Sequence, residues 1–158
     1  MSENTEVTRV SIDELPDLVG HQFPPGPWKA VEQQMIDAFA DATGDYQWIH
    51  VDTERAADGP FGTTVAHGFL TLSLLPRLVQ GQLEVSGIRM TLNYGVNKCR
   101  FPTPVPAGSR VRGVATIAEV HPRPDGTVQL VREVTAELEG SDKPACVAEL
   151  VGLYVPEA

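Results

Sequence analysis

Residues 67–80 read HGFLTLSLLPRLVQ. Large apolar side chains recur around this segment and leave it almost without a polar face: Phe69, Leu70, Leu72, Leu74, Leu75, Leu78 and Val79. A helix that is apolar nearly all round is typical of a buried element. Pro76 removes one backbone hydrogen bond and should kink the helix. The segment therefore predicts a buried helix that the other elements of the fold enclose.

C-terminal to this helix, the hydrophobic period changes from that of a helix to that of a strand. Apolar and polar residues alternate from Ile88 to Asn97, which predicts a half-buried strand. The alternation breaks near Lys98, where we expect a bulge or bend. The same reasoning predicts further antiparallel strands over residues 110–120, 128–138 and 145–155. The turn signal Pro124-Asp125-Gly126 joins the first two of these strands.

The first half of the chain is predicted to be mostly helical, so the expected fold class is α+β. Ser11 and Glu14 form a capping box for a short helix over residues 11–19, and a short edge strand is expected at residues 28–31. We expect one domain over residues 1–158, with an N-terminal helical extension at about residues 1–27.

Residues 32–43 show the clearest amphipathic pattern, and Gly44 follows where a C-terminal cap belongs. Residues 45–51 are expected to be non-helical, and Asp52 fits the N-cap of a short helix through Ala57. The pattern thus predicts two helices joined by an irregular loop.

The composition excludes several classes of protein. The 158 residues are 42% hydrophobic and 21% charged, which is typical of a folded domain. A formal net charge of −9 repels phosphate backbones, so we expect no nucleic-acid partner. Cys99 and Cys146 form neither a disulfide framework nor a zinc ligand set, and packed thiols are expected. Signal-peptide and membrane-spanning patterns are not found, so the expected location is the cytoplasm, without a membrane partner.

The segment 41–52, DATGDYQWIHVD, carries the clearest chemical signal. Asp45 and His50 lie five residues apart across a helix end, and a looping chain can direct both side chains to one point. A carboxylate and an imidazole placed in this way can share the giving and taking of protons. An Asp after a capping Gly is also ordinary turn chemistry, so the residues alone leave both interpretations open. A metal site from these two residues with Asp52 and His67 fits no recognised ligand spacing, and none is expected.

Gly44-Asp45, followed by Ile49-His50 and Ala56, resembles the signature of the MaoC-like dehydratases, the (R)-specific enoyl-CoA hydratases of the hot-dog fold. In that pattern Gly-Asp is followed by Asn-Pro, an aliphatic residue and His, and then by a small residue. Ala66-His67-Gly68 resembles the start of the central helix of the family, and the resemblance spans roughly residues 30–115. The sequence departs from the pattern at Gln47-Trp48, which replaces Asn-Pro. We expect Trp48 to pack under the loop as an anchor rather than to plug the acyl tunnel.

The resemblance implies a curved antiparallel sheet around a long central helix, and pairing into a homodimer. It implies interconversion of trans-2-enoyl-CoA and (R)-3-hydroxyacyl-CoA, with Asp45 and His50 as the catalytic pair and with no metal or redox cofactor. The implied partner is an acyl thioester of CoA or of acyl carrier protein. Gly68 is a candidate oxyanion donor through its backbone N–H, although tight packing explains a glycine there equally well. His67 is expected to cap or pack at the helix start rather than to help the site.

Two alternatives remain at this point. The first is an acyl-CoA thioesterase, since many proteins of the hot-dog fold that this chain resembles hydrolyse thioesters, often with a catalytic carboxylate on or beside the central helix. No Asp or Glu occurs between Asp58 and Glu84, which argues against hydrolysis. A non-catalytic acyl-thioester-binding subunit is the other alternative, and the presence of both Asp45 and His50 argues against it. The CoA phosphates have no assigned residues, although the nearest cations are Arg77, Arg89, Lys98 and Arg100.

Overall fold

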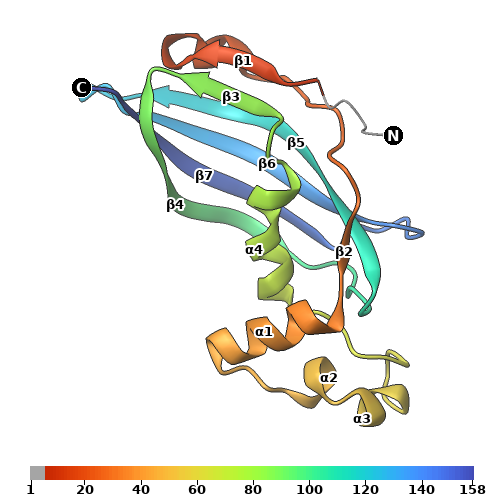
Figure 1. Ribbon diagram of the computed structural model, residues 1–158. Coiled ribbons are helices and arrows are strands. Elements are labelled where there is room, and N and C mark those ends of the chain that lie inside the picture. The colour runs from red at the N-terminus through yellow and green to blue at the C-terminus, as the bar shows by residue number, and fades with distance from the viewer. Residues whose placement is uncertain (1–5) are drawn as a thin grey trace.

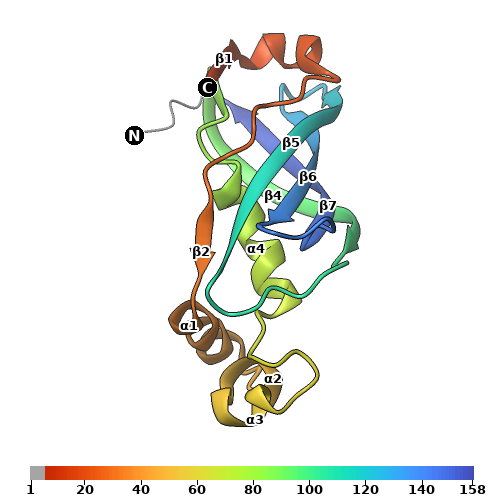
Figure 2. The ribbon, with the colours of Figure 1, turned by 90° about the vertical axis from the view of Figure 1, so that its right-hand side faces the viewer.

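The computed structural model describes residues 6–158, which form two sheets and a set of helices. The larger sheet is antiparallel and is built in the order β2-β5-β6-β7-β4. Its strands are β2 (Lys29–Val31), β4 (Ile88–Arg100), β5 (Ser109–Pro122), β6 (Val128–Leu138) and β7 (Cys146–Pro156). A smaller sheet pairs β1 (Thr8–Ser11) in parallel with β3 (Leu83–Ser86). Figures 1 and 2 show that the larger sheet curves around helix α4 (Gly68–Leu78).

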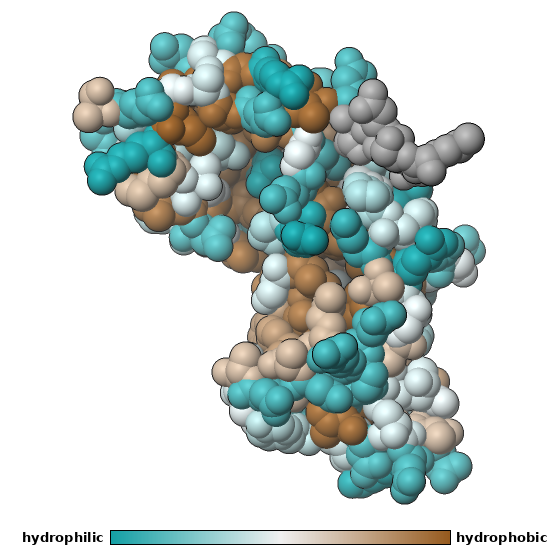
Figure 3. Space-filling view, viewed as in Figure 1, coloured by the Kyte–Doolittle hydropathy of each residue, from teal (hydrophilic) through white to brown (hydrophobic). Residues whose placement is uncertain are grey.

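Helix α4 packs one face against the sheet. Leu70, Leu75 and Leu78 are buried there, in one cluster with apolar residues of β5, β6 and β7, and Thr71 is buried as well. The predicted central helix in a curved sheet is therefore confirmed. Burial all round is not observed, because the side chain of Phe69 is 68% exposed and the other face of α4 borders an open cleft. Figure 3 shows hydrophobic residues gathered in the recess between the sheet and this helix.

The cleft beside α4 has a volume of about 530 Å³. Its walls come from Leu72, Ser73 and Pro76 of α4 and from residues of β4, β6 and β7. Strand β4 is an edge strand, and nearly all of its residues are exposed on both faces. The prediction of a half-buried strand at this position is therefore wrong. The predicted bulge is confirmed, because Lys98 has a φ of 50° and the pairing with β7 shifts between Asn97 and Arg100.

Three helices lie beyond the N-terminal end of α4 (Figure 1). They are α1 (Gln33–Thr43), α2 (Trp48–Val51) and α3 (Thr53–Ala57). Gly44 ends α1 with a φ of 76°, and Asp52 caps α3 by accepting a hydrogen bond from the Arg55 N–H at 3.0 Å, both as predicted. The expectation of a non-helical segment up to Val51 is wrong, because the Asp52 N–H bonds to the Trp48 carbonyl and closes the helical turn α2.

The N-terminal region contains one element that the pattern did not predict, strand β1. The expected short helix is a 3₁₀ helix, η1 (Ile12–Leu18), and the Ser11 N–H donates to Glu14 Oε2 at 2.7 Å, as the capping box requires. The part of the expected helical extension at residues 1–5 lies outside the described residues. Among residues 6–158, no helix is long and apolar enough to cross a membrane.

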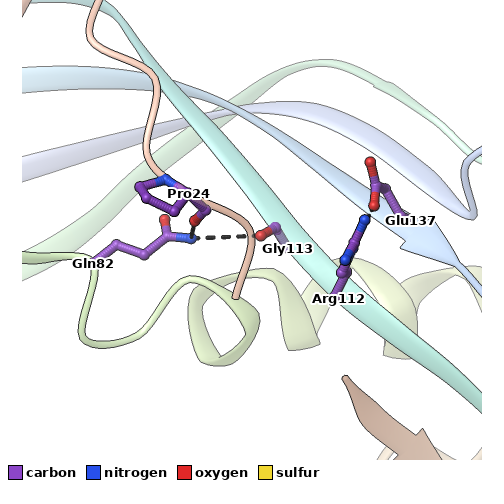
Figure 4. Close-up of polar contacts among 5 residues, drawn as sticks. All are labelled: Pro24, Gln82, Arg112, Gly113 and Glu137. Atoms are coloured by element: carbon purple, nitrogen blue, oxygen red, sulfur yellow. Dashed lines mark hydrogen bonds and ion pairs between the residues drawn. The ribbon is translucent and has the colours of Figure 1, made fainter. Parts of the chain in front are cut away.

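The C-terminal end of α4 is tied to the sheet through Gln82. Its Nε2–H donates to the Pro24 carbonyl at 3.0 Å and to the Gly113 carbonyl at 3.5 Å (Figure 4). Gly26 approaches the helix so closely that an added Cβ would lie 2.4 Å from the Leu78 carbonyl oxygen. This end of the helix is therefore fixed by backbone-to-backbone contact that tolerates no side chain at Gly26.

Candidate active site

His50 lies on α2 with 7% of its surface exposed. Its Nδ1 is 2.7 Å from the Val65 carbonyl oxygen. Since a carbonyl only accepts hydrogen bonds, Nδ1 must carry the proton, and Nε2 of the neutral ring is left with its lone pair. The contact therefore fixes the tautomer in which Nε2 can accept a proton.

Two residues that the sequence pattern did not single out hold His50 in place. Gln33 Nε2–H donates to the His50 carbonyl at 2.7 Å, and the Thr64 hydroxyl donates to Gln33 Oε1 at 2.5 Å. The Val65 N–H also donates to the Ile49 carbonyl at 3.0 Å. A Gln at a helix start is usually a surface residue, so no pattern in the sequence could have identified Gln33.

Asp45 lies on the exposed loop between Gly44 and α2. One of its carboxylate oxygens accepts a weak hydrogen bond from the Gln47 N–H at 3.3 Å, which is the turn contact that the alternative interpretation predicts. The same carboxylate also lies beside the two histidines, because ligand atoms of Asp45, His50 and His67 lie within 4.8 Å of one another. The predicted convergence of Asp45 and His50 is thus observed, and it includes His67.

His67 occupies the N-cap position of α4 but forms no side-chain capping hydrogen bond. Its Nε2–H donates to the Asp45 carbonyl at 3.0 Å instead. The ring stacks on His50 with a centroid distance of 3.9 Å and an interplanar angle of 23°. His67 Nδ1 is buried and has no hydrogen-bond partner among the described residues. Of the two roles expected at the helix start, capping is not observed and packing is, because the buried ring lies against His50 and Phe39.

Gly68 is the first residue of α4, half-buried, next to this cluster. Among the contacts of residues 6–158, its backbone N–H has no hydrogen-bond acceptor, as expected for the first turn of a helix. An added Cβ would lie 3.1 Å from the Phe101 ring. The geometry therefore agrees with both interpretations of this glycine, close packing and a free donor at a helix N-terminus.

Trp48, where the sequence departs from the family pattern, packs away from the cleft. An added Cβ at Gly59 would lie 3.0 Å from the indole ring, and the Arg55 guanidinium carbon lies 4.3 Å from the ring centroid. Trp48 does not line the cleft beside α4. These contacts agree with an anchor beneath the loop, while the effect of Trp48 on activity stays a prediction.

Asp45, His50 and His67 are also residue types that bind metal ions. Asp52, the fourth residue considered for such a site, caps α3 instead. Each histidine already uses one ring nitrogen in a hydrogen bond to a backbone carbonyl, and such bonds orient the imidazole both in metal sites and in acid–base sites. The residues therefore fit either chemistry.

The two cysteines lie outside this cluster. Cys146 is buried on β7, and burial together with the neighbouring Cys99 raises the pKa of its thiol to about 12. A thiol with such a pKa stays protonated and unreactive near neutral pH. Both cysteines are free, and the packed-thiol prediction is confirmed for Cys146.

Comparison with known proteins identifies, over most of the chain, the family that the sequence motifs resemble. Residues 16–138 match the MaoC like domain. The chain is 52% identical over 145 residues to the 3-hydroxyacyl-thioester dehydratase Z of Mycobacterium tuberculosis, covering 92% of this chain and 96% of that protein. It is 43% identical to nodulation protein N of Rhizobium leguminosarum, covering 90% of this chain and 89% of that protein.

The fold is also that of a solved (R)-hydratase from Pseudomonas aeruginosa, with a TM-score of 0.70 at 23% identity, covering 96% of this chain and 89% of that one. The architecture agrees with the curved sheet and central helix described above. The predicted α+β hot-dog fold and the predicted class of enzyme are confirmed. The chain belongs to the MaoC-like dehydratase family and is a hydro-lyase.

Proposed function

We propose that this protein hydrates trans-2-enoyl thioesters to (R)-3-hydroxyacyl thioesters, and catalyses the reverse dehydration, with Asp45 and His50 as the acid–base pair. The observation that carries the proposal is the meeting of the Asp45 carboxylate and the His50 ring at the N-terminal end of α4. The relationship to a 3-hydroxyacyl-thioester dehydratase supports the substrate class.

The proposed reaction is redox-neutral and needs proton transfer at two atoms. Water adds through its oxygen to C3, and its proton passes to the Asp45–His50 pair. The C2=C3 electron pair moves toward the thioester carbonyl, and the resulting enolate collapses when C2 takes a proton from the pair. His50 suits this work because Val65 holds the proton on Nδ1 and leaves Nε2 as the base. We propose that no metal or redox cofactor takes part.

The enolate oxygen needs a hydrogen-bond donor, and Gly68 is the proposed one. Its N–H lies at the N-terminus of an 11-residue helix, where backbone donors and the helix dipole favour negative charge. The absence of a side chain lets a thioester carbonyl approach the N–H closely. The acyl tail would then run along α4 into the cleft lined by Leu72 and Pro76.

We further propose a homodimer that pairs through the open edge of β4, next to the cleft. Alternate residues along β4 expose apolar side chains, including Leu92 at 44% and Tyr94 at 60%, and one long edge of this strand has no partner among the described residues. A long apolar edge of this kind is normally covered by another chain. Sedimentation as a monomer at micromolar concentration with full activity would contradict the dimer.

The function is tested with crotonyl-CoA by following the enoyl-thioester absorbance together with the release of free thiol. Loss of the band without thiol is the expected result, and chiral analysis should identify the product as the (R)-3-hydroxyacyl thioester. Thiol release would indicate a thioesterase instead. If neither signal appears across a series of chain lengths, on CoA and on acyl carrier protein, the protein is a binding subunit and the proposal is wrong. A cytoplasmic location stays a prediction.

A further inference from the structure

His67 contacts both members of the proposed catalytic pair through different parts of one side chain. Its Nε2–H holds the backbone carbonyl of Asp45 at 3.0 Å, and its ring face lies on the His50 ring at 3.9 Å. Phe39 packs on the ring from α1, with a centroid distance of 4.9 Å and an interplanar angle of 55°. Only 2% of the surface of His67 is exposed, so these contacts hold its ring in one position against both residues.

Asp45 depends on this contact more than His50 does. His50 lies on helix α2 and is tied to Val65 and Gln33. Asp45 lies on an exposed segment without regular secondary structure, and the 3.3 Å contact with Gln47 stays within the same loop. Among the hydrogen bonds of residues 6–158, Asp45 is joined to another element of the fold by the bond from His67 alone.

The unpaired nitrogen of His67 argues that packing alone does not explain this residue. A buried acceptor without a partner destabilises a fold, and an apolar ring of the same shape would fill the space without that cost. A phenylalanine would keep the stacking on His50 but could not hold the Asp45 carbonyl. The imidazole thus supplies a directed N–H at the cost of one unsatisfied atom.

We propose that His67 is a positioning residue, which sets the placement of Asp45 relative to His50 by holding the Asp45 backbone while it packs on the His50 ring. The inference rests on the proposed function of this pair. Displacement of a catalytic group by about 1 Å can cost about 10²-fold in rate, because proton transfer needs close alignment. The effect should therefore appear in kcat and hardly in KM, since His67 itself is not assigned a substrate contact.

Two substitutions separate the two contacts of His67. His67→Phe keeps a ring beneath His50 and removes the N–H donor. His67→Gln can place an amide N–H near the position of Nε2 and removes the ring. We expect His67→Phe to be at least as stable as the wild type, with kcat lowered about 10²-fold at nearly unchanged KM. We expect His67→Gln to recover at least about tenfold of this loss in kcat, although it is less stable.

Gln82→Leu is the matched control, because Gln82 is likewise buried, with 1% of its surface exposed, has one unpaired atom, and lies near the opposite end of α4. It should leave kcat unchanged. Wild-type kcat in folded His67→Phe would overturn the proposal, as would a His67→Phe chain that does not fold, since that would show a structural role. Equal kcat losses in the Phe and Gln variants would also overturn it. If Asp45→Asn and His50→Ala keep full activity, the proposed function fails first; if only the His67 variants do, this inference alone fails.

Discussion

The two ends of α4 each bury a polar side chain with one unsatisfied atom, and they use it differently. Near the C-terminal end, the Gln82 amide donates to the backbone carbonyls of Pro24 and Gly113, and both of these lie in the scaffold (Figure 4). At the N-terminal end, His67 donates to the carbonyl of a loop residue, Asp45, and stacks on His50. One end therefore fixes the helix to the sheet, while the other brings an exposed carboxylate together with two buried imidazoles.

The comparison shows that burial of a polar group does not by itself indicate function. Both side-chain hydrogen bonds of Gln82 go to backbone carbonyls, and no titratable side chain takes part in them. His67 lies within 4.8 Å of a carboxylate and a second imidazole. What separates a structural polar group from a functional one is whether its neighbours can exchange protons with a ligand.

The largest effect is expected at the N-terminal end. Asp45→Asn and His50→Ala should each lower kcat by about 10²–10⁴-fold, since each removes a group that transfers a proton. The double variant should lose little more than either single variant, because the two groups act as a unit. Steady-state hydration of crotonyl-CoA provides the measurement, and thermal unfolding checks that each variant is folded.

Matched controls for these variants exist among the exposed residues. Asp41 is an exposed carboxylate in the same region that accepts a hydrogen bond from Tyr46, and His121 is an exposed histidine paired with Glu119. Asp41→Asn and His121→Ala should keep wild-type kcat. Folded Asp45 and His50 variants with near-wild-type turnover would show that the convergence of these groups is turn chemistry and packing.

The next largest effects are expected from two glycine substitutions, one near each end of α4, which should lower different quantities. Gly26→Ala puts a Cβ 2.4 Å from the Leu78 carbonyl, so it should lower the free energy of unfolding by about 1–3 kcal/mol and leave the kcat of the folded fraction unchanged. Gly68→Ala meets only the Phe101 ring at 3.1 Å but crowds the proposed oxyanion donor, so it should lower kcat by about 10²-fold at nearly wild-type stability. Denaturant unfolding and kinetics measure the two losses. A Gly26→Ala variant that loses kcat at wild-type stability, or a Gly68→Ala variant that loses stability at wild-type kcat, would contradict these roles for the two ends.

A smaller effect is expected at Trp48. Trp48→Ala should lower the free energy of unfolding by about 1–3 kcal/mol and lower kcat as well, because the loop that carries Asp45 loses its support. The preference among acyl chain lengths should stay the same, since Trp48 does not line the cleft. Trp28→Ala is the control, because Trp28 also stacks under an arginine, Arg112, and should affect stability alone. A stable Trp48→Ala that prefers longer chains would identify the indole as a tunnel wall.

Metal removal is expected to have the smallest effect on kcat, namely none. Dialysis against a strong chelator should leave kcat unchanged, because the proposed role of Asp45, His50 and His67 is proton transfer and positioning. Metal analysis by mass spectrometry accompanies the assay. Activity that is lost on chelation and restored by a single divalent cation would instead assign these three residues to a metal centre.

The sequence predicts most of the scaffold because its signals are local. Alternation of residues predicts β5, β6 and β7, Gly44 and Asp52 predict the helix boundaries, and the phase break predicts the bulge at Lys98. The pairing of β1 with β3 is not predictable in this way, since it joins residues more than 70 positions apart. Alternation along β4 likewise predicts which residues share a face, but it says nothing about whether that face is covered.

The sequence predicts only part of the candidate site, because only part of it depends on local signals. Spacing and family resemblance identified Asp45, His50 and Gly68, which lie together at the N-terminal end of α4. The role of Gln33 and the contacts of His67 depend on tertiary structure. Gln33 reaches Thr64 across 31 residues, and His67 reaches Asp45 across 22 residues. Neither of these long-range contacts follows from a periodic pattern in the sequence.

Hydration in oxygen-18-labelled water reports which atom of the substrate the water attacks, and so tests both the reaction and the role of the Asp45–His50 pair. With crotonyl-CoA, we expect one labelled oxygen at C3 of an intact (R)-3-hydroxyacyl thioester, at a rate that falls by about 10²-fold or more in Asp45→Asn and in His50→Ala. Label in a free carboxylate together with released CoA, or label at C3 that forms at the wild-type rate in both variants, would contradict this expectation.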